Sequence, residues 1–262
     1  MPEMLRQNGF RTFATGKWHA DKGSFNRSFE EGENIFFGGM HSYDTKGHTA
    51  PLLRHYDPTG KYGKDVTFVG QKFSSQMFAD AAVDFIKSTQ DDQRPFMAYV
   101  ALTSPHDPRN VHPVDYGRVY DSRRVVLPDN FQPSHPFDNG ELDIRDERLL
   151  PAPRTPEAMR KELALYHNMV SEVDVQIGRV PDALKKAGKL GNTIIVFASD
   201  NGLAMGQNGL IGKQSLYEHM LGQAMQKAGD FCSLDRPRWW KDGHKISWGE
   251  LVKLYIFDQP KK

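Results

Sequence analysis

The sequence predicts an α/β fold built on a mostly parallel β-sheet. Three strand-like apolar segments are each followed by polar residues, and segments with helical periodicity connect them. This alternation is typical of proteins in which helices cover the faces of a parallel sheet. With 262 residues, the chain is long enough for one full domain of this class, or for one domain with a small appendage.

The most informative segment runs from residue 192 to residue 213. Its apolar, largely β-branched run at 194–198 predicts a strand buried on both faces. Asp200 and Asn201 follow at the carboxyl end of that strand, which is the edge where ligands bind in open α/β sheets. A glycine-spaced loop then leads to Lys213. Two oxygen-bearing side chains followed by a cation predict a metal-assisted site for an anionic group.

Two other strands end in comparable polar residues. The alternating segment 10–16 predicts a short strand that runs directly into Lys17 and His19. Taken alone, so short a motif is more often a surface lysine beside a structural histidine. Further along, a helical pattern at 74–87 precedes a buried strand at 96–102, and His106 follows that strand. The three strand ends together predict one pocket at a single edge of the sheet.

The remaining segments are less regular, except for one long helix. Thr155 is expected to cap this helix and Pro156 to occupy its first position. Its buried stripe is expected to leave Asp174 as a surface or packing carboxylate. The proline-rich stretch 109–156 predicts an excursion over the surface. Residues 20–69 look like a loop region. Its histidines are spaced too loosely for a metal cluster and are expected to be solvated; they are His41, His48 and His55.

Composition excludes several classes of protein. With a formal net charge of +1, the chain lacks the excess of basic residues that nucleic-acid-binding proteins carry. No run approaches the roughly 18 apolar residues of a membrane span. The single cysteine, Cys232, permits neither an intrachain disulfide nor a cysteine-cluster metal site.

The first six residues lack the apolar region of a signal peptide. Residues 4–9 instead look like the end of a helix, so we expect sequence upstream of them.

At this point the sequence resembles the sulfatase family, within the alkaline-phosphatase-like α/β superfamily. The match covers roughly residues 4–219, its order and spacing are specific, and bacterial sulfatases that act on sulfated sugars are the more similar members. The matching stretches are residues 9–12 and 16–19, the Ser-Pro-His at 104–106, Glu172 to Asp174 with Gly178 and Arg179, residues 193–202, Gly212 with Lys213, and residues 216–219.

The resemblance implies a three-layer sandwich with a mostly parallel central sheet, here incomplete at the N-terminus. It implies that Asp200 and Asn201 bind calcium, an ion that prefers oxygen ligands. It also implies that Lys17, His19 and Lys213 hold sulfate oxygens. His106 would donate a proton to the leaving alcohol or contact the sulfate. The expected partner is a sulfated small molecule or glycan, with no nucleic acid and no membrane span. Relatives are often periplasmic or secreted, but this chain leaves the compartment open.

The sequence also departs from the family pattern. The family's nucleophile is a formylglycine made in a C-x-P-S-R type motif, which occurs nowhere in this chain. Cys232 lies in a different context and is expected to be an inert thiol. The family's first strand, which carries two metal-binding aspartates, is also missing, so calcium is expected to be held weakly. We therefore expect residues 1–219 to form a partial catalytic domain, and residues 220–262 a helical, tryptophan-rich tail packed on it.

Three functions stay open at this stage. The first is a sulfatase whose chain alone is inactive. The second is a non-catalytic remnant or anion-binding module. The third is a phosphoesterase of the same superfamily, which would use Ser or Thr and two zinc ions. The missing His/Asp zinc pattern and the presence of the Gly-Lys-Trp-His motif argue against this third function.

Overall fold

The computed structural model describes residues 1–42, 44, 46–109, 120–215, 217 and 251–258, and this part of the chain forms a mixed α/β fold. The helices are α1 (Pro2–Gln7), α2 (Lys22–Ser28), α3 (Ser74–Ser88) and α4 (Pro156–Lys186). The strands are β1 (Arg11–Trp18), β2 (Glu31–Phe37), β3 (Leu52–Arg54), β4 (Thr67–Val69), β5 (Phe96–Pro105), β6 (Thr193–Ser199) and β7 (Leu251–Asp258). No described helix is both long enough and apolar enough to span a membrane.

The strands form one seven-stranded sheet in the order β4-β3-β2-β1-β5-β7-β6. β1 pairs in parallel with both β2 and β5 at the centre of the sheet. β7 is antiparallel to both of its neighbours, β5 and β6, so those two strands run in the same direction. Strands β1, β5 and β6 consequently end at one edge of the sheet, as predicted from the sequence.

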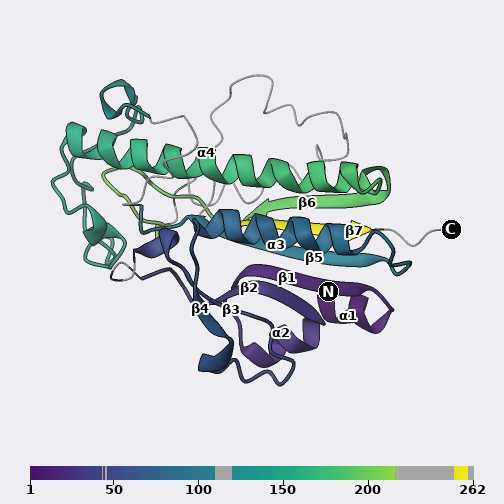
Figure 1. Ribbon diagram of the computed structural model, residues 1–262. Helices are drawn as coiled ribbons and strands as arrows, with labels where there is room; N and C mark the ends of the chain where they lie inside the picture. The colour runs from purple at the N-terminus through teal and green to yellow at the C-terminus, as the bar shows by residue number, and fades with distance from the viewer. Residues whose placement is uncertain (43, 45, 110–119, 216, 218–250, 259–262) are drawn as a thin grey trace.

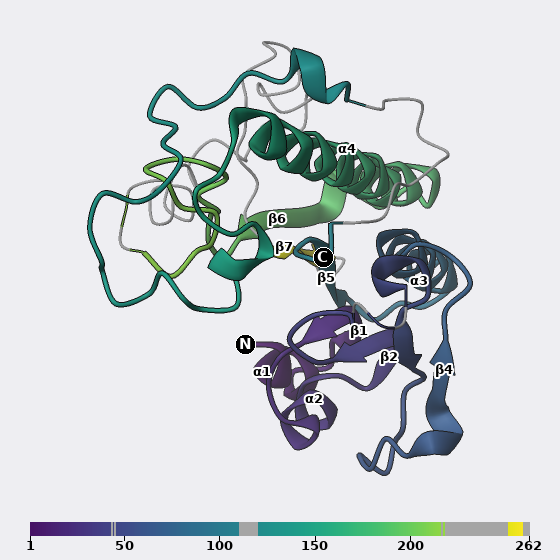
Figure 2. The same cartoon turned by 90° about the vertical axis from the view of Figure 1, so that its left-hand side faces the viewer.

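The molecule has three layers, with helices on both faces of the sheet (Figures 1 and 2). Helices α3 and α4 cover one face, where Phe78 and Val173 pack on Val100 and Leu254 of the sheet. On the other face, α2 packs over β1 and β2, and Phe25 belongs to that cluster. The predicted α/β class and layered architecture are therefore confirmed.

The predicted helices and central strands form close to their expected positions. The Thr155 side chain accepts a hydrogen bond from the Ala158 amide and caps α4, with Pro156 in its first turn. The expected helix end near residue 9 is also present, because α1 stops at Gln7 and Gly9 has φ +83°. The segment 20–69 is more regular than expected, since it contains α2 and β2 to β4.

Strand β6 corrects the expectation of a strand buried on both faces. Ile194 is 52% exposed and Val196 is 41% exposed, whereas Ile195 and Phe197 pack against the core. The physical reason is its place in the sheet. β6 lies at the edge, and α4 covers only the face that carries Ile195 and Phe197. An apolar β-branched run is therefore compatible with a half-exposed edge strand.

The end of the chain enters the sheet. Residues 251–258 form β7 between β5 and β6, so this part of the expected tail is a strand and not a helix. Leu254 and Ile256 are almost fully buried in the core beneath α4. Residues 220–250, including Cys232, lie outside the described residues. The proposed boundary at residue 219 stays a prediction.

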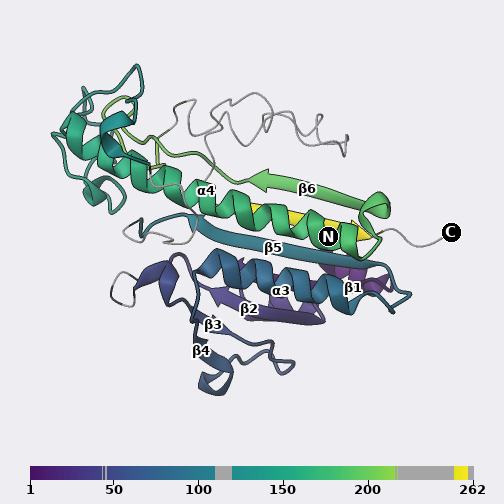
Figure 3. The same cartoon turned by 45° about the horizontal axis from the view of Figure 1, so that its top comes forward.

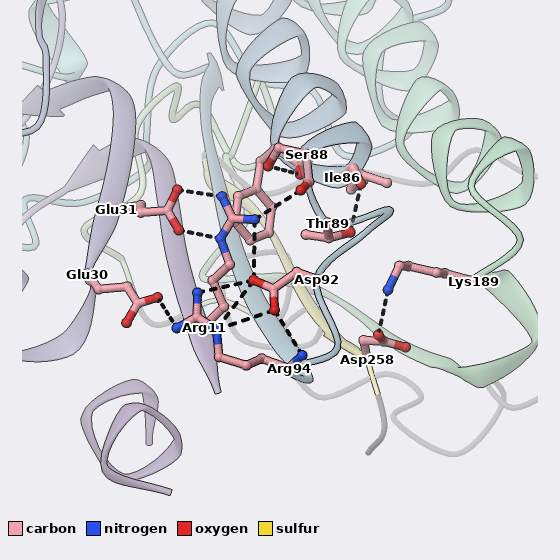
Figure 4. Close-up of polar contacts among 11 residues, drawn as sticks. Arg11, Glu30, Glu31, Ile86, Ser88, Thr89, Asp92, Arg94, Lys189 and Asp258 are labelled. Carbon is pink, nitrogen blue, oxygen red and sulfur yellow. Dashed lines mark hydrogen bonds and ion pairs between the residues drawn. The ribbon is translucent and has the colours of Figure 1, made fainter. Parts of the chain in front are cut away.

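Two separate groups of ion pairs and hydrogen bonds join neighbouring elements at the edge where β1 and β5 begin (Figure 4). Arg11 of β1 forms an ion pair with Glu31 of β2 and approaches Asp92 at 3.8 Å, just before β5. At the end of β7, Asp258 accepts a hydrogen bond from Lys189 Nζ at 3.2 Å. The first group joins the start of β1 to β2 and to the turn before β5, and the second joins the end of β7 to the turn before β6.

Candidate active site

The carboxyl ends of the parallel strands surround a cavity of about 270 Å³. Five of the six predicted site residues line it, together with three residues that the sequence had not indicated. The lining residues are Lys17, His19, Gly39, Met40, His106, Arg145, Asp200 and Lys213. Loops after β5 and β6 gather at this end of the molecule (Figure 3). The structure thus brings together side chains from three strand ends and one loop, as expected.

Lys17 is positioned by a glycine at the end of β1. Gly16 has φ +89°, and the pairing of β1 with β2 shifts register between Thr15 and Gly16. A Cβ atom on Gly16 would lie 1.9 Å from the Ala101 carbonyl oxygen, so no other residue fits without moving the backbone. The extra residue of this shift, Asn34, belongs to β2, whereas β1 and β5 pair without interruption. The missing side chain of Gly16 is therefore what allows β1 to lie close to β5 directly before Lys17.

The cavity is strongly basic, and burial opposes its positive charge. Burial, followed by the neighbouring charge of Lys213, lowers the pKa of Lys17 to about 8. Burial also lowers the pKa of Lys213. The pKa of His19 is lowered by burial and by Lys17, so its imidazole is neutral at neutral pH. Within the part of the chain that the structure describes, Asp200 is the one acid that lines the cavity. An anion bound there would relieve the repulsion between the two lysines.

His106 is oriented by its neighbour Asp107. The His106 Nδ1 atom lies 2.9 Å from the Asp107 carboxylate and 3.0 Å from the Asp107 carbonyl oxygen, so Nδ1 carries a proton. His106 Nε2 therefore points into the cavity, 3.4 Å from Lys213 Nζ. Burial raises the pKa of Asp107, but His106, Arg145 and Arg109 together hold that pKa well below its usual range. The carboxylate stays charged and fixes the imidazole.

A buried series of hydrogen-bonded side chains supports the backbone of His106. His48 Nε2 donates to the His106 carbonyl oxygen at 2.9 Å, which leaves His48 Nδ1 to accept from the Ser74 hydroxyl at 2.8 Å. Thr103 connects Ser74 to His41 Nε2, with both distances 3.0 Å. Burial lowers the pKa of His41 to about 2 and that of His48 to about 4, so both rings are neutral.

The burial of His41 and His48 corrects the expectation that the loop histidines are solvated. His41 is 3% exposed and His48 is 0% exposed, whereas His55 is exposed and forms an ion pair with Glu33. Their loose spacing in the sequence concealed the fact that a loop folds His41 and His48 beneath the end of β5. Asp174, by contrast, lies half-buried on α4, consistent with a packing carboxylate.

Asp107 and Arg145 were not among the residues predicted from the sequence. Asp107 could have been noticed because it directly follows His106. Arg145 carries no such signal, since it lies in the aperiodic excursion after β5. It reaches the cavity through an ion pair with Asp146 and approaches Asp107 at 3.6 Å.

The predicted metal ligands supply an incomplete set of donors. Asp200 lines the cavity, and its Oδ1 atom accepts a hydrogen bond from the Asn201 amide at 2.9 Å. Asn201 is half-buried, and its Nδ2 atom donates to the Gly202 carbonyl oxygen at 2.9 Å. Among the described residues, no group of three His, Cys, Asp or Glu side chains could hold a metal. Calcium takes six to eight oxygens, so these two residues do not complete a calcium site.

Comparison with known proteins assigns the family. The family model described as Sulfatase matches residues 1–229. The chain belongs to the sulfatase family. An uncharacterised sulfatase of Schizosaccharomyces pombe is 30% identical over 230 residues, which are 77% of this chain and 40% of the relative. An arylsulfatase of Klebsiella aerogenes is 29% identical over 228 residues, which are 77% of this chain and 47% of the relative. The sulfatase chain described here thus spans less than half the length of these relatives.

Solved structures agree on the fold of this sulfatase chain. A structure described as a sulfatase, yidJ from Bacteroides fragilis, covers 99% of this chain with a TM-score of 0.60 at 18% identity. The match spans 49% of that protein. A phosphonate monoester hydrolase of Agrobacterium radiobacter gives a TM-score of 0.53 at 17% identity, covering 98% of this chain and 51% of the hydrolase. The shared architecture spans both sulfatases and hydrolases of phosphorus esters.

Proposed function

We propose that the cavity binds the sulfate group of a sulfate ester, and that the chain carries the sulfate-binding part of a sulfatase active site. The observation that carries this proposal is the convergence of Lys17, Lys213, His19 and His106 on one cavity at the strand ends. Two partly desolvated ammonium groups and two imidazoles suit an anion whose charge is spread over several oxygens.

Each side chain has a role in this proposal. Lys17 and Lys213 neutralise the charge of the sulfate, and neutral His19 donates a hydrogen bond to one of its oxygens. His106 is held by Asp107 with Nε2 toward the cavity, where it contacts the sulfate or, once protonated, donates a proton to the leaving alcohol. Lys213 Nζ lies 3.4 Å from His106 Nε2, so both groups can contact one bound sulfate.

We infer that the family reaction is the hydrolysis of sulfate esters, and that this chain alone does not carry it out. The sequence contains no C-x-P-S-R type motif to supply the family's nucleophile. A chromogenic aryl sulfate should therefore show no turnover with the isolated chain. Clear hydrolysis that disappears in Lys213→Ala would contradict this expectation. Reading the DNA upstream of the Met1 codon would test it independently, since an in-frame motif there would place the nucleophile in a longer product.

The alternative is a non-catalytic protein that binds anions. This alternative is favoured by the same absence of a nucleophile motif, and it makes the same prediction for aryl sulfate. The two proposals differ when a longer product exists. A sulfatase gains turnover once the missing motif is supplied, whereas an anion-binding module does not.

Calcium is the metal that we propose for Asp200 and Asn201, held weakly. Two oxygen donors from this chain leave most of the coordination sphere to water or to the substrate. We expect calorimetry to give a dissociation constant no tighter than about the millimolar range of weak extracellular sites. A submicromolar constant that is lost in Asp200→Ala would mean that further ligands exist.

The proposed substrate is a sulfated small molecule or glycan. The support comes from the relatives, which include the human N-acetylgalactosamine-6-sulfatase at 25% identity over 235 residues, covering 83% of this chain and 37% of that relative. The cavity itself does not distinguish a sugar from an aryl group. Inorganic sulfate therefore provides the most direct probe of the proposal. Sulfate should bind with a 1:1 stoichiometry, and Lys213→Ala should weaken binding at least tenfold; unchanged binding would contradict the proposed site.

A further inference from the structure

The loop that carries Lys213 has little regular structure of its own. Between β6 and Lys213, four residues have positive φ angles: Met205, Gly206, Asn208 and Gly209. A Cβ atom on Gly209 would lie 2.2 Å from the Ser134 carbonyl carbon, so the loop is pressed against the excursion that follows β5. The position of Lys213 is therefore determined mainly by contacts between its loop and the excursion, and not by a helix or strand.

Glu147 holds the two residues that precede Lys213. Its carboxylate accepts from the Gly212 amide at 2.8 Å and from the Ile211 amide at 3.1 and 3.2 Å. The Glu147 side chain is 6% exposed, so these hydrogen bonds are formed away from water. A charged acceptor for two consecutive backbone amides is a strong and directional attachment.

Arg154 holds the same loop from the other side. Its Nη2 atom pairs with the Glu147 carboxylate at 2.6 Å, and its Nη1 atom donates to the Gly209 carbonyl oxygen. Its remaining Nε donor is used by the Leu150 carbonyl oxygen at 2.8 Å. The Arg154 side chain is only 3% exposed. The pair thus fixes a carbonyl at residue 209 and amides at residues 211 and 212.

The neighbouring residues extend this attachment to both halves of the cavity. Asp146 accepts from the Gln214 side chain at 2.8 Å, which fixes the residue that follows Lys213. Arg145 connects Asp146 to Asp107, the carboxylate that orients His106. The segment 145–154 therefore links the two functional groups that face each other at 3.4 Å, Lys213 and His106.

We propose that Glu147 and Arg154 are positioning residues that hold the Lys213 ammonium against His106 for anion binding. This inference rests on the proposed function of the cavity. A buried ion pair is weak evidence for stability, because apolar residues of similar volume often stabilise a fold as well or better. The pair here has a directional task that apolar residues lack, since its oxygens and nitrogens fix named backbone atoms next to Lys213.

The test measures inorganic sulfate binding to the full chain and its Glu147→Gln variant. Glutamine keeps the volume but removes the charge and one of the two acceptor oxygens. We expect sulfate affinity to fall roughly tenfold and the Ile211 and Gly212 amides to exchange faster with solvent. Glu157→Gln is the matched control, because the Glu157 side chain is 79% exposed and pairs with exposed Lys161 on the surface of α4. That control should leave both measurements unchanged.

A double variant separates positioning from a general structural effect. If Glu147 acts through Lys213, adding Glu147→Gln to Lys213→Ala should cause no further loss of sulfate affinity. An equal further loss, or wild-type affinity and exchange in folded Glu147→Gln, would overturn the proposal. If Glu147→Gln fails to fold, Arg154→Lys tests the same proposal, because lysine keeps the charge but lacks the planar fork of the guanidinium. We expect sulfate affinity to fall threefold or more in this variant. Unchanged sulfate affinity would overturn the proposal. Absence of sulfate binding by the natural chain would instead overturn the proposed function.

Discussion

Lys17 combines burial with a position between other bases, and this makes anion binding sensitive to alkaline pH. Its pKa is lowered to about 8, chiefly by burial and then by Lys213. The ammonium form binds the anion, so sulfate affinity should be constant below about pH 8 and fall by up to tenfold per pH unit above it. Calorimetric titration with sulfate between pH 6 and 10 measures this dependence.

The control for this prediction is Lys17→Met, which removes the titrating group. This variant should bind sulfate weakly, and the inflection near pH 8 should move upward. An affinity that stays constant to pH 10 in the natural chain would contradict the role given to Lys17.

Glu172 on α4 predicts a separate pH effect, on stability. It is fully buried, and burial raises its pKa to about 7, although Ser75, Gln176 and Arg179 nearby oppose the rise. Because the folded-state pKa exceeds the unfolded value of about 4.5, the folded chain binds the proton more tightly. The stability from this proton is fully present below about pH 4.5 and is lost as pH rises through about 7.

The variant Glu172→Gln should therefore be more stable than the natural chain above pH 7, by up to about 3 kcal/mol. The difference should vanish as pH falls toward 4.5. Urea unfolding of both chains at pH 5 and pH 8 measures it. Equal free energies of unfolding at pH 8 would mean that the carboxylate is solvated or paired.

At the scale of single elements, the end of β1 depends on Gly16. In Gly16→Ala the methyl group meets the Ala101 carbonyl oxygen at 1.9 Å, so β1 and β5 must separate. We expect a loss of roughly 3 kcal/mol or more in stability, together with weaker sulfate binding. Gly9→Ala is a matched control, because Gly9 has a similar φ of +83° but open space around its Cβ position. A loss equal to that of the control would assign the effect to φ alone.

Element types were largely predictable from the sequence, whereas their places in the sheet were not. Local periodicity identifies α3, α4, β1, β5 and β6, because each pattern belongs to a single segment. The edge position of β6 was missed, since an apolar run carries no information about how many neighbours a strand has. β7 was read as part of a tail, although Val252, Leu254 and Ile256 alternate with polar or amphipathic residues.

The site was predictable to the extent that it follows strands. Lys17 lies at the end of β1, and His19, His106 and Asp200 come directly after strands, so the topology of a parallel sheet brings them together. Lys213 was found through the glycine-spaced loop that follows β6. Arg145, Glu147 and Arg154 were missed, because they lie in an aperiodic segment whose contacts with that loop span about sixty residues of sequence.

At the scale of the whole molecule, β7 closes the sheet between the strand that leads to His106 and the strand that leads to Asp200. It pairs along its length with both, and it buries Leu254 and Ile256. A chain that ends at residue 250 should therefore not fold cooperatively, because β5 loses a neighbour and β6 is left unpaired. Circular dichroism during heating measures this, with a chain ending at Asp258 as the control.

Retention of a sharp thermal transition in the chain ending at residue 250 would contradict the structural role of β7. It would show that α3 and α4 hold β5 and β6 without a strand between them. The expected loss is large, since two buried aliphatic side chains alone contribute about 3 to 6 kcal/mol.

We propose that this sulfatase-family chain retains a sulfate-binding cavity formed by Lys17, His19, His106 and Lys213. The most direct measurement is NMR of the histidine imidazoles during titration with inorganic sulfate. His19 and His106 should shift together with one dissociation constant, exposed His55 should not shift, and Lys213→Ala should weaken the response. Shifts confined to His55 or other surface residues, with His19 and His106 unchanged, would contradict the proposal.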